Sequence, residues 1–230
     1  MSCDNMVLDL GVKSNLDSSL CRYYHIINNR RNNINKMNKT LIIVDPQNDF
    51  VSGNLAVNDA KEVMKNIVSE LVMGDYTQVI VTVDWHPFDH CSFNTQGGEW
   101  PTHCIQHTWG AAIVSNISSM LVELNKRGIG VDIVEKGSEP NKEEYGAFGY
   151  DIPQSYIYSK IVNLSDPIYI CGVAGDYCVY DTTVNLLKLG FSNITVLTDC
   201  IASIDGGIKL NGLIECNNLK KIRQHSLQSG

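Results

Sequence analysis

Short apolar runs recur along the chain from residue 39 onward, and each run ends near a polar side chain. The runs cover residues 41–44, 79–83, 131–134, 168–171 and 194–197. A short continuous apolar run is typical of a strand that is buried on both faces of a sheet. The pattern therefore predicts five buried strands.

Between these runs, apolar residues follow the spacing of helices. Residues 60–72 present one apolar face, and Asn58 and Asp59 precede them as candidate cap residues. Further amphipathic helices are predicted over residues 113–124 and 178–190. Strands that alternate with helices are typical of βα crossovers, so the sequence predicts an α/β fold with a mostly parallel sheet.

Residues 1–37 lack both patterns. This segment is polar and holds seven asparagines, and its irregular apolar residues are too few to offset the entropy cost of ordering. We expect a mostly disordered N-terminal extension at 1–37 and one folded domain at 38–230. Met37 is a candidate alternative start. The pair Arg30–Arg31 is compatible with a targeting peptide, but the nearby acids favour a plain tail.

The composition narrows the function classes. Of the 230 residues, 43% are hydrophobic and 19% are charged, as in ordinary globular proteins. The net charge of −7 disfavours broad binding to nucleic acid, because phosphates repel an acidic surface. No apolar stretch approaches the roughly 18 residues of a membrane helix. We therefore expect a small-molecule ligand and neither a nucleic-acid nor a membrane partner.

The eight cysteines include no Cys-x-x-Cys pair, and no apolar secretory leader precedes them. We therefore expect reduced cysteines and a cytoplasmic location, with the nucleus also accessible to so small a protein. Cys171, Cys200 and Cys216 are interpreted as small buried side chains.

Four chemically versatile residues follow predicted strands, namely Asp45, Asp84, Lys136 and Cys178. Ligands of parallel sheets bind just beyond the carboxyl ends of the strands, so these side chains are expected at one edge. A helix begins near Cys178, and its N-terminal dipole is expected to lower the pKa of the thiol. A thiol, a carboxylate and an ammonium group suit a nucleophile, a proton carrier and an electrostatic partner. The alternative for each residue is structural: a buried thiol, a turn, a solvated lysine or, for Asp49, a helix cap.

Histidines are concentrated in one part of the chain. Four of the six fall within 22 residues: His86, His90, His103 and His107. Asp84-x-His86 places two side chains on one side of an extended segment, and His103 follows 17 residues later. One carboxylate and two imidazoles suit Zn²⁺, Fe²⁺ or Mn²⁺ and leave positions open for water or substrate. Hydrogen-bonded histidines in surface loops are the alternative, whereas a structural zinc site with Cys91 or Cys104 has the wrong cysteine spacing.

Five segments, taken together, resemble a known family. They are Asp45-Pro46-Gln47-Asn48-Asp49-Phe50, Asp84-Trp85-His86-Pro87 with His90 and Ser92-Phe93, Trp100-Pro101-Thr102-His103-Cys104, Lys136-Gly137 and Gly172-Val173-Ala174-Gly175-Asp176-Tyr177-Cys178-Val179. In this order they are similar to the nicotinamidases, which belong to the isochorismatase-like cysteine hydrolases. The resemblance runs from about residue 39 to about residue 205.

The resemblance implies a doubly wound α/β fold with a six-stranded, mostly parallel sheet and helices on both faces, in one hydrolase domain at 38–230. It also implies an amidohydrolase that converts nicotinamide to nicotinate and ammonia through a cysteine thioester, a step of NAD salvage. By position, Asp45, Lys136 and Cys178 match the catalytic triad of the family.

The resemblance further implies the ligand set and the substrate contacts. Asp84, His86 and His103 match the ligands of one divalent metal ion, for which Zn²⁺ is expected and Fe²⁺ or Mn²⁺ are alternatives. Phe50 and Trp100 match aromatic residues that flank the nicotinamide ring.

The family has a cis peptide at the position of Val173–Ala174, which aims the backbone N–H groups of Ala174 and Cys178 into an oxyanion hole. This chain departs from the family at Gly175, where threonine is more common, so the rigidity of that turn is left open. His90 is a metal ligand in some relatives and an orienting neighbour in others, and it is left out of the ligand set.

Two other interpretations stay open. One is a relative that acts on another amide or on isochorismate, although such relatives generally lack the set Asp84-x-His86…His103. The other is a metal-binding interaction protein without catalysis, which the joint presence of a matching triad disfavours. The sequence leaves the oligomeric state open, and a homo-oligomer is compatible with it.

Overall fold

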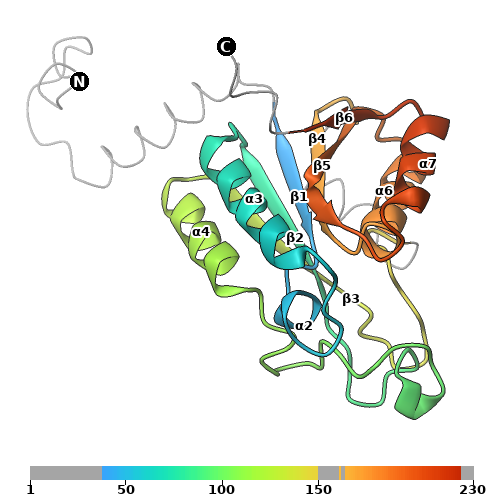
Figure 1. Ribbon diagram of the computed structural model, residues 1–230. Helices are drawn as coiled ribbons and strands as arrows, with labels where there is room; N and C mark the ends of the chain where they lie inside the picture. The colour runs from blue at the N-terminus through green and yellow to red at the C-terminus, as the bar shows by residue number, and fades with distance from the viewer. Residues whose placement is uncertain (1–37, 150–160, 162–163, 224–230) are drawn as a thin grey trace, which may run out of the picture. The chain divides into compact units, whose positions relative to one another are not determined.

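Six parallel strands form the central sheet, in the order β3-β2-β1-β4-β5-β6 (Figure 1). They are β1 (Thr40–Val44), β2 (Gln78–Asp84), β3 (Gly130–Lys136), β4 (Ile168–Val173), β5 (Ile194–Ala202) and β6 (Lys220–Ile222). The computed structural model describes residues 38–149, 161 and 164–223, so the disorder expected at 1–37 lies outside the described residues. The first five strands coincide with the five predicted apolar runs, and the parallel sheet is confirmed.

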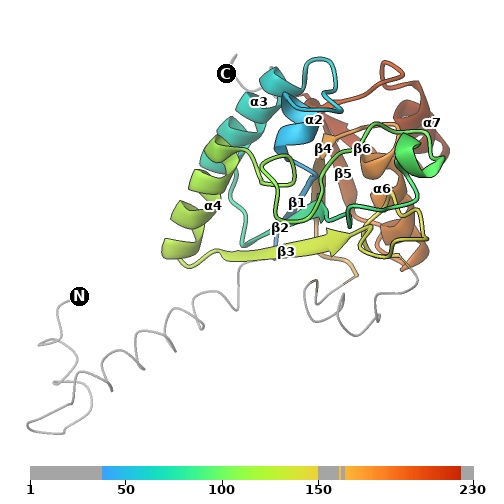
Figure 2. The ribbon, with the colours of Figure 1, turned by 90° about the horizontal axis from the view of Figure 1, so that it is seen from below.

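Helices cover both faces of the sheet (Figure 2). The helices α3 (Ala60–Met73) and α4 (Ser115–Lys126) pack on one face, and α6 (Cys178–Lys188) and α7 (Ile208–Cys216) on the other. The short helices α2 (Asn48–Val51) and η2 (Asn94–Gln96) lie in the connections. The doubly wound fold implied by the resemblance is therefore confirmed. No helix in the described part of the chain is both long enough and apolar enough to cross a membrane.

Each face of the sheet has its own hydrophobic core. Alternate residues of β1 point to opposite faces, so Leu41 and Ile43 join the core under α3 and α4. Ile42 and Val44 join the core under α6 and α7. Burial of an aliphatic side chain of this size contributes about 1.5–3 kcal/mol to folding. This two-sided burial explains why β1 is a continuous apolar run.

The strand order places one crevice at the centre of the sheet. The chain proceeds outward from β1 through β2 to β3 and then crosses to β4 on the other side of β1. The direction of winding therefore changes between β1 and β4. Ligands of doubly wound sheets bind beyond the carboxyl ends of the strands at such a switch point.

Four local expectations differ from the structure. The run at 131–134 was expected to be buried on both faces, but β3 lies at an edge of the sheet, and five of its seven residues are half-buried or exposed. Asp59 stands just before α3, but it has a φ of 63° and its side chain makes no capping hydrogen bond. Cys216 is exposed, whereas Cys171 and Cys200 are buried as expected. The strand β6 was missed because all three of its residues are exposed, so no apolar run marks it.

Candidate active site

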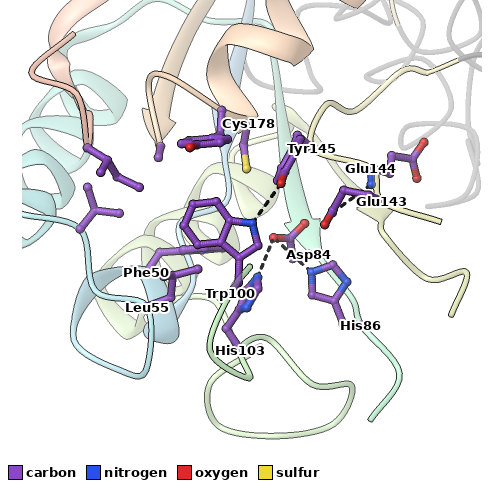
Figure 3. A pocket seen from close by; sticks show the side chains of 14 residues that line it. Phe50, Leu55, Asp84, His86, Trp100, His103, Glu143, Glu144, Tyr145 and Cys178 are labelled. Atoms are coloured by element: carbon purple, nitrogen blue, oxygen red, sulfur yellow. Dashed lines mark hydrogen bonds and ion pairs between the residues drawn. The ribbon is translucent and has the colours of Figure 1, made fainter. Parts of the chain in front are cut away.

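The chemically versatile residues converge at the carboxyl edge of the sheet, as predicted. Asp45 follows β1, Asp84 ends β2, Lys136 ends β3, and Cys178 begins α6 just after β4. All four are buried, with exposed fractions of 0%, 4%, 1% and 5% respectively. Asp84 and Cys178 line the same pocket (Figure 3).

Lys136 contacts each of the other three groups. Its Nζ lies 2.8 Å from Asp45 Oδ2 and 3.6 Å from Cys178 Sγ, and it donates a hydrogen bond to Asp84 Oδ1. Burial alone would lower the pKa of Lys136, but the charges of Asp45 and Asp84 raise it well above its ordinary value. Lys136 is therefore a charged ammonium group that links two buried carboxylates and a thiol.

Asp45 has one carboxylate oxygen in a position to accept a proton. Its Oδ1 accepts a hydrogen bond of 2.7 Å from the Thr82 hydroxyl. Apart from the ion pair with Lys136, Oδ2 has no hydrogen-bond partner among the described residues. A carboxylate oxygen of Asp45 lies within 4.8 Å of Cys178 Sγ. Burial raises the pKa of Asp45 and Lys136 only partly opposes this, so the carboxylate is a stronger base than an exposed aspartate.

The thiol of Cys178 differs from the expectation for a helix N-terminus. Burial raises its pKa well above the ordinary value, and the nearby Asp45 and Asp84 act in the same direction, while Lys136 opposes them. The expectation of a lowered pKa was wrong because it considered the helix dipole and not the loss of water around the sulfur. The resting group is therefore a neutral thiol that needs a base.

Two backbone donors lie beside this thiol. The Val173–Ala174 peptide is cis, as the resemblance implied. Within the described part of the chain, the N–H groups of Ala174 and Cys178 donate to no protein acceptor. Free N–H groups beside a nucleophile are suited to hold an oxyanion.

Gly175 fits the packing of its turn. Its N–H donates to the Ala202 carbonyl at 2.8 Å, so the turn is tied to β5. A Cβ at this position would lie 2.0 Å from Ser203 Oγ. The Ser203 side chain therefore fills the space that a threonine at position 175 would need.

Asp84, His86 and His103 lie together, as predicted, in an arrangement that could hold a metal ion. His86 Nε2 lies 3.5 Å from Asp84 Oδ2, and His103 Nε2 lies 3.9 Å from the same oxygen (Figure 3). Burial alone would raise the pKa of Asp84, but Lys136 and the two histidines hold it well below its ordinary value. The carboxylate is therefore ionised and directed at both imidazoles.

The hydrogen bonds of the two Nδ1 atoms fix the tautomers of His86 and His103. Nδ1 of His86 lies 2.7 Å from the Gly137 carbonyl, and Nδ1 of His103 lies 2.7 Å from the Pro101 carbonyl. A carbonyl only accepts hydrogen bonds, so each neutral ring carries its proton on Nδ1 and presents the Nε2 lone pair to the cluster. Together with Asp84, this donor set fits a divalent cation. The two histidines are 2% and 4% exposed, so they are buried and do not lie at the surface as the alternative interpretation had it.

His90 is close to this cluster but uses both of its nitrogens elsewhere. Its Nε2 lies 3.0 Å from the Lys142 carbonyl, and its Nδ1 lies 2.7 Å from Ser92 Oγ. Its ring stacks on His86 with centroids 4.1 Å apart. His90 is therefore an orienting neighbour in this geometry, while His107 is exposed and packs against Trp85.

Gly137 leaves room for the ring of His86. Its φ is +63°, and a Cβ at this position would lie 2.4 Å from His86 Cε1. Only glycine combines this backbone conformation with so close an approach of the imidazole. The residue that follows Lys136 therefore also supports the metal-binding cluster.

Aromatic side chains form the walls of the pocket. Phe50 packs against His103 with ring centroids 5.5 Å apart. Trp100 donates a hydrogen bond of 3.0 Å from Nε1 to the Tyr145 hydroxyl (Figure 3). It also packs edge-on against Tyr177. The sequence interpretation assigned no role to either tyrosine. Tyr145 lies in a loop without periodicity, so no pattern marks it.

Comparisons with known proteins agree with this geometry. A family model described as the isochorismatase domain matches residues 39–215. The nicotinamidase of Saccharomyces cerevisiae is 35% identical over 194 residues, which cover 70% of this chain and 86% of that protein. The nicotinamidase of Escherichia coli is 31% identical over 186 residues, which cover 70% and 81%.

Solved structures are similar over most of the chain. The yeast nicotinamidase Pnc1p bound to nicotinaldehyde has a TM-score of 0.70 and 30% identity, and the match covers 81% of this chain and 100% of that one. The pyrazinamidase of Pyrococcus horikoshii in complex with zinc has a TM-score of 0.65 and 29% identity, with 80% and 98% covered. Sequence and fold agree, and the chain belongs to the isochorismatase-domain family of hydrolases.

Proposed function

We propose that this protein is a metal-dependent nicotinamidase, which hydrolyses nicotinamide to nicotinate and ammonia through a cysteine thioester. One observation carries the proposal: Lys136 joins the Asp45–Cys178 pair to Asp84, whose other oxygen faces His86 and His103. Nucleophile, base and metal-binding groups thus belong to one buried cluster. The nicotinamidases among the similar proteins support the choice of substrate.

The pocket suits a planar aromatic amide. Phe50 and Trp100 lie on its walls, and Cys178 and the cluster around Asp84 both line it. Asp84, His86 and His103 would hold one divalent ion, for which Zn²⁺ is our first choice and Fe²⁺ or Mn²⁺ are alternatives. When bound there, the ion supplies a Lewis acid for the ring nitrogen of nicotinamide.

The chemistry of the amide follows from Asp45 and Cys178. Asp45 takes the proton of the thiol as the sulfur attacks the amide carbon, which gives a tetrahedral oxyanion. The N–H groups of Ala174 and Cys178 stabilise this oxyanion by about 3 kcal/mol per donor, as in comparable sites. Asp45 then gives its proton to the departing nitrogen, and ammonia leaves the thioester. Water attacks the thioester as Asp45 accepts one of its protons, and Asp45 then gives that proton to the departing sulfur, which restores the thiol. The product leaves as nicotinic acid and ionises to nicotinate, and ammonia takes up the released proton.

Lys136 has an electrostatic role in these steps. Its ammonium group lies next to the carboxylate that exchanges the proton and next to the sulfur that attacks. A fixed positive charge there limits the cost of moving negative charge between oxygen and sulfur inside a dry site.

The wider role is part of the same proposal. Hydrolysis of nicotinamide in the cytoplasm would serve NAD salvage, and a small-molecule substrate needs neither nucleic acid nor a membrane. We also propose that residues 38–230 act as one hydrolase domain.

The test is release of ammonia from nicotinamide by the purified full-length protein, before and after chelation and after Zn²⁺ is returned. We expect release that chelation abolishes and metal restores. Cleavage of another carboxamide but not of nicotinamide, with metal supplied, would replace the substrate. Release that chelation leaves unchanged would remove the metal from the proposal.

A further inference from the structure

Two buried polar side chains beside the site have no part in the proposed chemistry. Gln47 and Asp49 follow Asp45 at alternate positions, and they are 0% and 6% exposed. The helix cap offered as the structural alternative for Asp49 does not apply, because Gln47 occupies the N-cap position of α2 and makes no side-chain capping hydrogen bond. Both residues therefore need another explanation.

Gln47 binds the main chain of Asp84 on both sides. Its Oε1 accepts a hydrogen bond from the Asp84 N–H at 2.8 Å, and its Nε2 donates to the Asp84 carbonyl at 2.7 Å. The second Nε2 hydrogen bonds to the Ala111 carbonyl at 2.9 Å. A primary amide has the donor and the acceptor that this arrangement needs. Gln47 therefore fixes the backbone from which the Asp84 carboxylate projects.

Asp49 holds the loop that carries His103. Its Oδ2 accepts a hydrogen bond of 2.8 Å from the N–H of Cys104, which belongs to the peptide bond directly after His103. Its Oδ1 accepts the N–H of Asn54 at 3.1 Å. Among the described residues this carboxylate has no basic partner within ion-pair distance, so backbone N–H groups balance its charge.

Two glycines enclose the carboxylate of Asp49. A Cβ at Gly110 would lie 1.9 Å from Oδ2, and a Cβ at Gly53 would lie 2.2 Å from Oδ1. The carboxylate therefore has no room to turn away from Cys104. The Cys104 carbonyl in turn accepts the N–H of His86 at 3.1 Å, so the same short segment also touches the third member of the cluster.

We propose that Gln47 and Asp49 are positioning residues that set Asp84 and His103 in place before the metal ion binds. The inference rests on the proposed function, since it takes Asp84, His86 and His103 as the ligands. Ligands that are already aligned lose less conformational freedom on binding, and removal of such supporting contacts typically weakens metal affinity by about 10–100-fold.

The test is a titration of the metal-free, full-length protein with Zn²⁺. Asp49→Asn keeps the shape of the side chain but turns an NH₂ group toward the N–H of either Cys104 or Asn54. Gln47→Leu removes the three hydrogen bonds that Gln47 makes with Asp84 and Ala111. Asp176→Asn is the matched control, because Asp176 is also a buried carboxylate that accepts two backbone N–H groups, those of Ile204 and Asp205, at 2.9 and 3.1 Å.

We expect the dissociation constant for Zn²⁺ to rise by about 10–100-fold in Asp49→Asn and in Gln47→Leu, and to stay near the parent value in Asp176→Asn. Urea unfolding of each metal-free variant measures the loss of stability separately. If Gln47→Leu does not fold, the isosteric Asp49→Asn decides. Parent-like Zn²⁺ affinity in Asp49→Asn, or an equal loss in Asp176→Asn, overturns the proposal.

The experiment distinguishes failure of this positioning role from failure of the proposed function. A parent protein that binds Zn²⁺ but releases no ammonia from nicotinamide overturns the substrate and still allows the comparison of variants. A parent protein that binds no Zn²⁺ overturns the positioning role, whatever its activity. The absorption spectrum of the Co²⁺-loaded protein gives a second readout, because its visible bands depend on ligand geometry. We expect these bands to change in Asp49→Asn and to stay unchanged in Asp176→Asn. An unchanged spectrum of Asp49→Asn counts against the proposal.

Discussion

Asp45 and Asp84 share one ammonium group, because Lys136 Nζ lies 2.8 Å from Asp45 Oδ2 and also donates to Asp84 Oδ1. The proposed base and a proposed metal ligand are thus coupled through a single buried charge. A change at Lys136 is therefore expected to affect proton transfer and metal binding together.

Replacement of Lys136 by methionine is expected to destabilise the metal-free protein by about 3–5 kcal/mol at pH 7, because two buried carboxylates lose their only nearby ammonium group among the described residues. Urea unfolding measures this difference. Turnover is expected to fall as well, since proton transfer from Cys178 then lacks a compensating charge.

The loss of stability caused by Lys136→Met is expected to shrink as the pH falls from 7 toward 5. In the parent, the pKa of Asp84 is lowered, so its stabilisation is present above the unfolded pKa and is lost only as the pH falls through the folded value. In the variant, the loss of Lys136 raises the pKa of Asp84 and of Asp45 relative to the parent, although His86 and His103 still lower that of Asp84. The folded variant therefore takes up protons at a higher pH than the folded parent and gains stability toward acid pH. A stability difference that does not vary with pH contradicts this account.

Replacement of Cys178 by alanine is expected to abolish ammonia release and to leave the bound metal unchanged, because the sulfur is the nucleophile and not a ligand. Metal analysis and a nicotinamide assay on the same sample test both parts. Cys200→Ala removes a buried thiol from the hydrophobic core and serves as the control. Appreciable turnover by Cys178→Ala would refute the assignment.

Replacement of Thr82 by valine is expected to move the acid limb of kcat/KM to higher pH by about one unit. Asp45 must be ionised to act as the base, and the Thr82 hydroxyl donates to its Oδ1 and so lowers its pKa. A hydrogen bond to a charged group is worth about 1.5–3 kcal/mol, which corresponds to one or two pKa units at most. The limb is expected to stay in place in Thr183→Val, which loses a hydroxyl bonded to the Val179 carbonyl.

Replacement of His103 by alanine is expected to lower the metal content strongly, whereas His90→Asn retains it. His103 presents a free Nε2 to Asp84, while both nitrogens of His90 already contact Ser92 and Lys142. Metal analysis after extensive dialysis compares the two variants. A greater loss in His90→Asn than in His103→Ala would reverse the two assignments.

The sequence was sufficient to locate the main elements and the convergence of the site. Asp45 follows β1 and Asp84 ends β2, and both strands are apolar runs that burial on two faces makes recognisable. Lys136 ends β3, an edge strand that is only partly buried. The strand β6 lacks this signature, because an exposed edge strand is held by its neighbour and not by its own apolar residues.

Other properties of the site depend on contacts that no local pattern encodes. The pKa of Cys178 follows from burial by segments that are distant in sequence, so a helix start alone predicted the wrong direction. The sequence left the role of His90 open. The structure distinguishes it from His86 by hydrogen bonds, because the Lys142 carbonyl occupies Nε2 of His90, whereas the Gly137 carbonyl occupies Nδ1 of His86. The role of Asp49 likewise depends on a loop that begins more than fifty residues later.

The shared ammonium group also fixes how much charge the interior holds. With both carboxylates ionised, Asp45, Asp84 and Lys136 sum to a single negative charge. Nicotinamide is neutral, so when the thiol proton moves to Asp45 the sum of these three groups becomes zero while the oxyanion carries one negative charge. The total charge of site and substrate is therefore unchanged. The protein interior therefore never has to accommodate a newly created ion during acylation, only the displacement of an existing one over a few ångströms.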